Sequence, residues 1–128
     1  MKKIAKFFLI IIFIIIIVNI VILIKSISPN ITYNGITNNA ITAYINIEIE
    51  NDTYNDLIIS ADDFCVKSET SSAITAKDIY LVVDNNYTYE KTLLINKGET
   101  KKYRLVYNKA DIPERASLYY KGKEVCKL

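Results

Sequence analysis

Apolar and polar residues follow two different patterns along this chain. Residues 7–24 form an uninterrupted apolar run that carries no charge and a single polar side chain, Asn19. As a helix with a rise of 1.5 Å per residue, this run would be about 27 Å long, which is close to the hydrocarbon thickness of a bilayer. A helix that is apolar on every side is unsuited to a small soluble core. The pattern therefore predicts one transmembrane helix over residues 7–24.

Basic residues around the apolar run predict its orientation. Three lysines lie within residues 1–6, whereas only Lys25 follows the run closely. By the positive-inside rule, residues 1–6 stay in the cytoplasm and the remainder of the chain is exported. A cleaved signal peptide is the alternative, because Ser26 and Ser28 are small enough for a cleavage site, although Pro29 fits poorly after such a cut. We expect an uncleaved, single-pass anchor in the cell membrane with an extracellular C-terminal domain.

The residues that follow the anchor have a different composition. Residues 25–40 are rich in Ser, Asn, Thr and Gly and show no sustained period of apolar positions. Such a composition is typical of a flexible connection. We therefore expect a spacer that lifts the following domain off the membrane.

From residue 41 onward the pattern is that of β-structure. Residues 41–50 alternate strictly between apolar and polar side chains, which is typical of a strand with one buried face. Residues 67–77 are polar and predict a loop, and Gly98 is expected to permit a turn with positive φ. Further strands are predicted at residues 57–59 and 64–66 (one bent strand or two short ones), 79–83, 92–95 and 101–107, and residues 118–126 are expected to form a hairpin or a bent final strand. About seven short strands predict an all-β domain, a β-sandwich, over residues 41–128.

Charge argues against one class of partner. The chain has a formal net charge of +2, but residues 25–128 alone have a net charge of −1. A general nucleic-acid binder would show a basic surplus, so we expect no nucleic-acid partner. Residues 41–90 have a net charge of −8 and residues 91–128 a net charge of +6. Either acidic and basic strands lie side by side and neutralise each other, or one face of the domain is directed at a partner.

Residue types exclude most catalytic sites. The chain contains no histidine, which removes Ser-His-Asp and Cys-His nucleophilic sites and zinc sites that need imidazole. Its three glycines form no phosphate-binding loop. Acidic residues are concentrated between Glu48 and Asp63, but they lack the spacing of a calcium-binding loop, and a solvated strand face explains them. We therefore predict a non-enzymatic protein with no catalytic residue, no cofactor and no metal site.

Cys65 and Cys126 are the two cysteines of the chain, and both fall on predicted strands of the exported domain. An even number of cysteines in an oxidising compartment favours a disulfide. In the chain-entropy model, closing a loop of this length stabilises the fold by about 4 kcal/mol. Two buried free thiols are the alternative. A redox-active pair is disfavoured because the Cys-x-x-Cys spacing is absent.

The ten tyrosines divide into two groups. Exposed tyrosines are common in recognition surfaces, whereas tyrosines in register with apolar positions belong to a core. Those predicted to lie in the core are Tyr103, Tyr107 and Tyr120. Those predicted to be exposed are Tyr44, Tyr87, Tyr89 and Tyr119.

A family resemblance covers most of the exported part. It rests on a strand pattern and one turn: Ile49-Glu50-Asn51, Leu57-Ile58-Ile59-Ser60, Phe64-Cys65-Val66, Asn96-Lys97-Gly98-Glu99, Arg104-Leu105-Val106-Tyr107 and Leu118-Tyr119-Tyr120. The chain resembles the extracellular immunoglobulin-like domains of Gram-positive bacteria known as domain of unknown function 4352. The resemblance implies an immunoglobulin-like β-sandwich on a lipoprotein or single-pass membrane protein, and it implies no site. This chain departs from the family by lacking a lipobox cysteine and the Gly-Tyr hairpin after Phe64.

These observations predict a membrane-anchored, extracellular binding module whose partner is a protein or a component of the cell envelope. Sandwich domains commonly bind through loops at their ends. The candidate binding residues therefore lie in the loops 67–77 and 84–89: Ser68, Glu69, Thr70, Ser71, Ser72, Asn85, Asn86 and Tyr87. Two alternatives stay open. The chain is a structural subunit whose helix packs in a membrane complex through Asn19, or it is a cleaved, secreted ligand or immunity factor.

Overall fold

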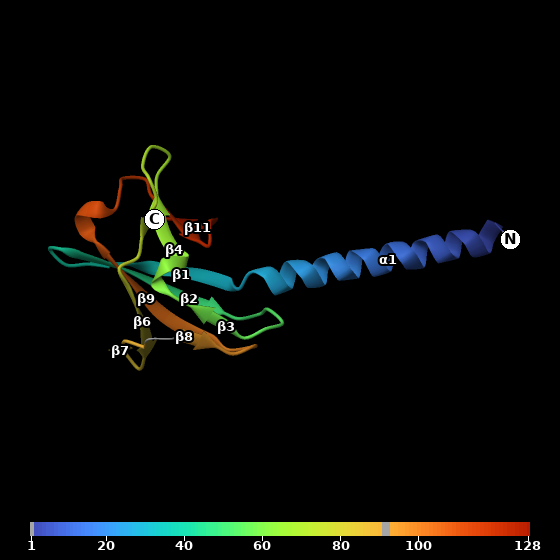
Figure 1. Ribbon diagram of the computed structural model, residues 1–128, viewed down its shortest axis with the longest axis horizontal. Helices are drawn as coiled ribbons and strands as arrows, with labels where there is room; N and C mark the ends of the chain where they lie inside the picture. Colours follow the sequence, from blue (N-terminus) through green and yellow to red (C-terminus); the bar gives the residue numbers. More distant parts are fainter. Residues whose placement is uncertain (1, 91–92) are drawn as a thin grey trace.

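One long helix and a β-rich domain make up the protein (Figure 1). The computed structural model describes residues 2–90 and 93–128, and the side chains of residues 21–27 lie outside this description. Helix α1 spans Lys2–Ile27. It is the one helix in the described residues that is long and apolar enough to cross a bilayer, and none of that stretch is buried against the domain. Both a membrane anchor and a signal sequence meet this description.

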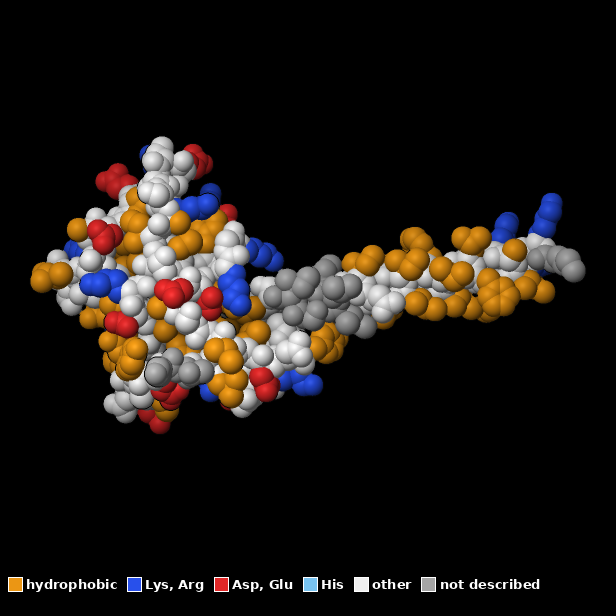
Figure 2. Space-filling view, in the orientation of Figure 1, with side chains coloured by type: hydrophobic (Ala, Val, Ile, Leu, Met, Phe, Trp, Pro, Cys, Tyr) orange, Lys and Arg blue, Asp and Glu red, His pale blue; other side chains and the backbone are white. Residues whose placement is uncertain are grey.

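Hydrophobic side chains cover the described part of α1 beyond the lysines at its N-terminal end (Figure 2). After α1, the described residues form eleven strands and two short 3-10 helices, η1 (Ala61–Asp63) and η2 (Lys109–Asp111). The strands are β1 (Asn30–Asn38), β2 (Thr42–Glu50), β3 (Leu57–Ile59), β4 (Phe64–Lys67), β5 (Ile74–Thr75), β6 (Asp78–Val83), β7 (Asn86–Thr88), β8 (Leu93–Ile95), β9 (Thr100–Asn108), β10 (Ser117–Tyr120) and β11 (Lys123–Lys127). The domain is mostly β-structure, as the sequence predicts.

The strands form antiparallel sheets. The largest has the order β1-β2-β9-β6-β7, the second has the order β11-β10-β4-β5, and β3 pairs with β8. Strand β2 pairs along its full length with β9, so that Glu48 lies opposite Lys102. The acidic first half of the domain therefore lies beside its basic second half, which favours local neutralisation over a single charged face.

The core lies between the sheets and receives side chains from all of them. In β2 the residues Ala43, Ile45, Ile47 and Ile49 are buried while their neighbours face outward, which confirms the predicted alternation. The core also contains Phe64, Val66, Leu118 and Tyr120 of the second sheet, Ile59, Leu93 and Ile95 of the two-stranded pair, and Ile79, Tyr103, Leu105 and Tyr107 of the first sheet. Sheets that share one core in this way are consistent with a β-sandwich.

The spacer expected at residues 25–40 is wrong for residues 30–38, because these form β1 and pair with β2. Ile31, Tyr33 and Ile36 are partly buried against the core. The register shifts between Tyr33 and Ile36, where Gly35 has a φ of +102°. A bulge inserts an extra residue and reverses the alternation of side chains. It therefore hides the period of two that would have identified a strand.

Short strands account for the other differences. Residues 57–59 and 64–66 are two strands of different sheets, separated by η1. The loop expected at residues 67–77 contains the two-residue strand β5. The strand expected at residues 92–95 is present as Leu93–Ile95, and Thr92 lies outside the described residues. Gly98 occupies a turn with a φ of +84°, as predicted.

Candidate functional site

Arg104 lies near the middle of the outer surface of the five-stranded sheet. Its neighbours along β9, Tyr103 and Leu105, are buried in the core, so alternation directs Arg104 outward. The sheet register places Asn46 of β2 on one side of Arg104 and Tyr80 of β6 on the other. The half-buried Arg104 is thus surrounded by side chains from neighbouring strands.

Two tyrosine rings hold the guanidinium group of Arg104. Its Cζ atom lies 4.0 Å from the ring centroid of Tyr87 and 4.9 Å from that of Tyr44. Tyr44 comes from β2 and Tyr87 from β7, on either side of β9. A guanidinium at this distance is attracted by the negative face of an aromatic ring. The two rings therefore limit the orientations that Arg104 can adopt.

A chain of hydrogen bonds through Asn46 also restrains the same guanidinium. The Nε atom of Arg104 donates to the Oδ1 atom of Asn46 at 2.9 Å. The Nδ2 atom of Asn46 in turn donates to the carbonyl oxygen of Gly35 at 3.3 Å and to the Oγ1 atom of Thr37 at 3.2 Å. The chain connects β9, β2 and β1. These bonds also assign the oxygen and the nitrogen of the Asn46 amide, and they use only the Nε atom of the guanidinium.

Two more tyrosines extend this surface. The rings of Tyr80 and Tyr89 meet edge to face, with centroids 6.1 Å apart. Tyr87 and Tyr89 expose 50% and 64% of their surface, which is high for aromatic residues of a folded domain. We call this surface the tyrosine–arginine face, and it consists of Tyr44, Tyr80, Tyr87, Tyr89 and Arg104.

Arg104 has no counter-ion within the described residues. The one ion pair found there joins Lys101 and Glu99, with 3.9 Å between Nζ and Oε2. No described residue accepts a hydrogen bond from the two terminal amino groups of Arg104. A guanidinium offers parallel donors that match the two oxygens of a carboxylate or a phosphate. The tyrosine–arginine face can therefore bind an anionic group flanked by apolar or aromatic surface.

The predicted binding loops are separated in the structure. Residues 68–72 form a tight turn after β4, in which the backbone N–H of Ser68 donates to Ser71 Oγ at 2.9 Å. This turn and the β6–β7 hairpin lie on opposite sides of the domain (Figure 1). Asp84 and Asn85 form the hairpin turn with φ values of 50° and 63°. Of the eight predicted residues, Tyr87 alone belongs to the tyrosine–arginine face.

Reasoning from the sequence missed Arg104, Asn46 and Tyr80. The alternation of β9 already directed Arg104 outward, and Arg with Tyr is the composition of many binding hot spots. What the sequence does not contain is the pairing of β9 with both β2 and β6. That pairing brings together residues almost sixty positions apart in the chain, such as Asn46 and Arg104.

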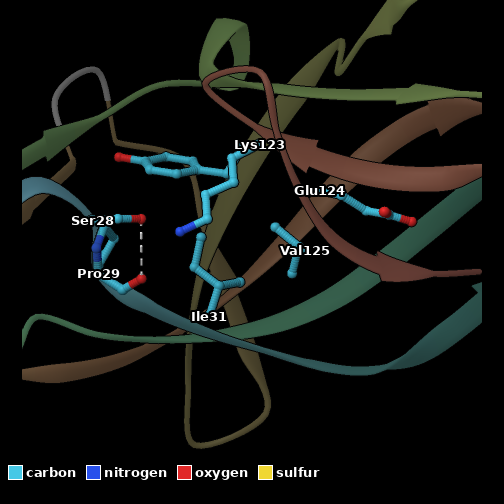
Figure 3. Close-up of a pocket in the computed structure, with 7 residues that line it drawn as sticks. Ser28, Pro29, Ile31, Lys123, Glu124 and Val125 are labelled. Atoms are coloured by element: carbon cyan, nitrogen blue, oxygen red, sulfur yellow. Dashed lines mark hydrogen bonds between the residues drawn. The ribbon is translucent and has the colours of Figure 1, made fainter. Parts of the chain in front are cut away.

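A pocket of about 150 Å³ is lined in part by Ser28 and Pro29, the two residues between α1 and β1. Figure 3 shows the residues that line it. We call it the junction pocket. Its lining consists of Ser28, Pro29, Ile31, Tyr120, Lys123, Glu124 and Val125. The amine of Lys123 is directed toward Ser28 and Pro29, whereas the carboxylate of Glu124 is directed away from them (Figure 3). Burial, together with the charge of Asp63, raises the pKa of Tyr120 to about 12.

The Cys65–Cys126 disulfide is not formed in the structure, where both residues are free thiols. Cys65 lies opposite Tyr119, and Cys126 lies opposite Leu118. Because Tyr119 and Leu118 are successive residues of β10, the two cysteines are on opposite faces of the sheet with β10 between them. A disulfide needs Cα atoms within about 7 Å and side chains directed at each other, which this register prevents. The expected disulfide is therefore not supported.

Metal-binding side chains do not cluster in the described residues. No three His, Cys, Asp or Glu side chains there could hold a metal ion together. The acidic residues considered for calcium are distributed over β2, η1 and the turn between β2 and β3.

Comparison with known proteins identifies no relative of this chain. No protein-family model, curated protein or solved structure matches the chain. The resemblance to domain of unknown function 4352 therefore stays a prediction.

Proposed function

We propose that this chain is a single-pass membrane protein that presents an immunoglobulin-like β-sandwich outside the cell as a non-enzymatic binding module. In this proposal the tyrosine–arginine face is the binding surface, and its partner is a protein or an anionic component of the cell envelope. The single observation that carries the proposal is Arg104. It is oriented by Tyr44, Tyr87 and Asn46, yet its terminal amino groups have no partner among the described residues.

The anchor is supported by the length and apolar character of α1 and by the lysines at its N-terminal end. The immunoglobulin-like fold is supported by two multi-stranded antiparallel sheets that share one core and by the resemblance described above. A binding role is consistent with the exposed tyrosines, which are common at protein interfaces. None of these features requires a catalytic group.

The physical basis of binding is preorganisation. A free arginine side chain loses rotamer freedom when it binds, at a cost of up to about 2 kcal/mol. Two rings and Asn46 already restrict Arg104 in the folded domain, so most of its rotamer freedom is lost on folding and little remains to be lost on binding. Tyr87 and Tyr89 supply exposed aromatic area around the charge. A central arginine surrounded by tyrosines is the arrangement in which binding energy commonly concentrates.

Site-specific photo-crosslinking in cells tests the binding surface. A benzophenone amino acid is placed at Tyr89, beside Arg104, or at Ser72, in the loop first considered for binding. We expect a covalent adduct from position 89 that disappears in the Arg104→Ala background, and no adduct from position 72. An adduct from position 89 that persists in that background would contradict the proposal. Adducts from position 72 alone would restore the loop as the binding site.

The intact mass of the protein recovered from membranes tests the anchor. A full-length mass in the membrane fraction is expected. A mass truncated near Ser28, with the protein in the medium, would identify a secreted factor instead. If crosslinks arise at Asn19 and nowhere on the domain, the structural-subunit alternative replaces the binding module.

A further inference from the structure

We propose that the junction pocket binds the phosphate of a phospholipid headgroup from the membrane that holds α1, with Lys123 as the contacting cation. This proposal rests on the membrane anchor of the proposed function but not on the tyrosine–arginine face. It means that the domain lies directly on the bilayer surface in one orientation. The expected spacer would have allowed the domain to move freely above the membrane.

The length of α1 places the pocket at the depth of the headgroups. The apolar run ends at Ile24, and Ser28 follows four residues later, which is about 6 Å along a helix axis. The headgroup region on each side of a bilayer is about 5–8 Å thick, from the difference between total and hydrocarbon thickness. A pocket lined by Ser28 and Pro29 therefore lies among the phosphates when residues 7–24 span the hydrocarbon.

The connection between helix and domain is too short to change this position. Only Ser28 and Pro29 separate the end of α1 at Ile27 from the start of β1 at Asn30. Pro29 is buried, and β1 is paired with β2 from its first residue onward. Proline also restricts its own φ and the conformation of the residue before it. The domain is thus held against the membrane end of the helix.

The chemistry of the pocket suits a phosphate. Lys123 directs its amine toward the wall formed by Ser28 and Pro29 (Figure 3). No carboxylate of the described residues lies within ion-pair distance of this amine, because the single ion pair found there is Lys101–Glu99. A volume of about 150 Å³ equals the space of about five water molecules, which is sufficient for a phosphate group.

The acidic groups near the pocket do not neutralise Lys123. Glu124 lines the pocket, but its carboxylate is directed away from the helix junction (Figure 3). The charge of Asp63 raises the pKa of Tyr120, but no ion pair joins Asp63 to Lys123 among the described residues. A lysine at the surface of an anionic membrane is attracted to the phosphate layer. We therefore expect Lys123, rather than the acidic residues, to determine what the pocket binds.

Lysine-selective acylation followed by peptide mass spectrometry tests the proposal on the full-length chain. The protein is placed in maltoside micelles, in phosphatidylcholine nanodiscs and in nanodiscs containing phosphatidylglycerol. Because phosphatidylcholine carries the same phosphate, we expect acylation of Lys123 to be slower in both kinds of nanodisc than in micelles, by about fivefold in those with phosphatidylglycerol. Lys127, which is also exposed on β11, is the internal control and should react at the same rate in micelles and in nanodiscs.

Lipid retention provides a second readout that a shielding effect alone would not change. Native mass spectrometry after partial removal of lipid should find one phosphatidylglycerol fewer on Lys123→Gln than on the unaltered chain, and no change for Lys127→Gln. Both substitutions replace exposed side chains, so equal thermal unfolding of the two variants is required. Equal lipid retention by both variants would overturn the proposal.

Two further outcomes separate this proposal from others. Protection of Lys123 by inorganic phosphate in micelles, to the same degree as by lipid, would identify an anion site that does not depend on the membrane and would overturn the proposal. Cleavage of α1 in cells would remove the anchor of the proposed function, whereas the nanodisc experiment on the full-length chain would still report on the pocket. The two failures are therefore distinguishable.

Discussion

The side-chain amide of Asn51 donates a hydrogen bond to the carbonyl oxygen of Ile95 at 2.9 Å and so connects the turn after β2 to strand β8. The same Nδ2 atom donates to the carbonyl oxygen of Asn55 at 2.8 Å. The Oδ1 atom of Asn51 accepts from the N–H of Thr53 at 3.1 Å and from its hydroxyl at 2.5 Å. Asn51 is completely buried, and each of its polar side-chain atoms has a partner. A satisfied buried amide of this kind rigidifies the turns that it joins.

Replacing this amide should destabilise the domain. Asn51→Ala leaves the carbonyl of Ile95 and the N–H of Thr53 without their partners in a buried environment, so we expect a loss of about 3 kcal/mol in the free energy of unfolding. Urea denaturation monitored by tyrosine fluorescence measures the loss. Asn55→Ala is the matched control, because Asn55 is exposed and contributes only its backbone carbonyl. Equal stability of the two variants would contradict the role of Asn51.

The tyrosine–arginine face should matter for binding more than for folding. Arg104→Ala removes contacts with two rings and with Asn46, and we expect it to cost about 1 kcal/mol of stability. We expect the loss in partner affinity to be larger, at least about 2 kcal/mol, as for the central residue of a hot spot. Arg115→Ala, which removes an exposed arginine from a loop, is the control. A variant of Arg104 that unfolds but binds normally when folded would refute this expectation.

Alkaline pH should unfold the domain through its buried tyrosines. Burial raises the pKa of Tyr120 from 10.0 to about 12, and it also raises the pKa values of Tyr103 and Tyr107. Above pH 10 the unfolded chain releases protons that the folded chain retains, so stability is complete below pH 10 and falls as pH rises toward about 12. The slope is about 1.4 kcal/mol per pH unit for each tyrosine.

Tyr120→Phe isolates the contribution of one hydroxyl to this alkaline loss. The variant should lose less stability between pH 10 and about 12 than the unaltered chain does. Tyr54→Phe, which replaces an exposed tyrosine, is the control. If stability falls with pH equally in the unaltered chain and in Tyr120→Phe, the hydroxyl of Tyr120 does not contribute to the alkaline loss of stability.

The two cysteines should both react with a thiol reagent in the unreduced protein. Their separation by β10 predicts two alkylation adducts in the intact mass. Burial and the charge of Glu124 raise the pKa of Cys126, while a hydrogen bond with the backbone of Leu118 lowers it in part. Because the thiolate is the reactive form, Cys126 should be alkylated more slowly in the folded protein than after denaturation. A mass without adducts would restore the disulfide and contradict the observed register.

The strand pattern of the domain was largely predictable because burial acts on neighbouring residues. In β2 and β9 every second side chain enters the core, so the period of two appears directly in the sequence. The sequence pattern did not predict strand β1, because a bulge at residues 34–35 interrupts the alternation of its side chains. Strands β5 and β7 contain two and three residues, which is too short for a period to be visible.

The sequence alone determined the apolar helix, the β-class of the domain and the inward position of Tyr103, Tyr107 and Tyr120, because these depend on local order of apolar residues. Only the tertiary structure decided that Arg104 lies between Tyr44 and Tyr87, that β10 separates the two cysteines, and that the helix joins the domain through two residues. The physical reason is that strand pairing is a long-range choice. Hydrogen bonds between strands are chemically alike for every partner, so the partner is selected by the packing of the whole core.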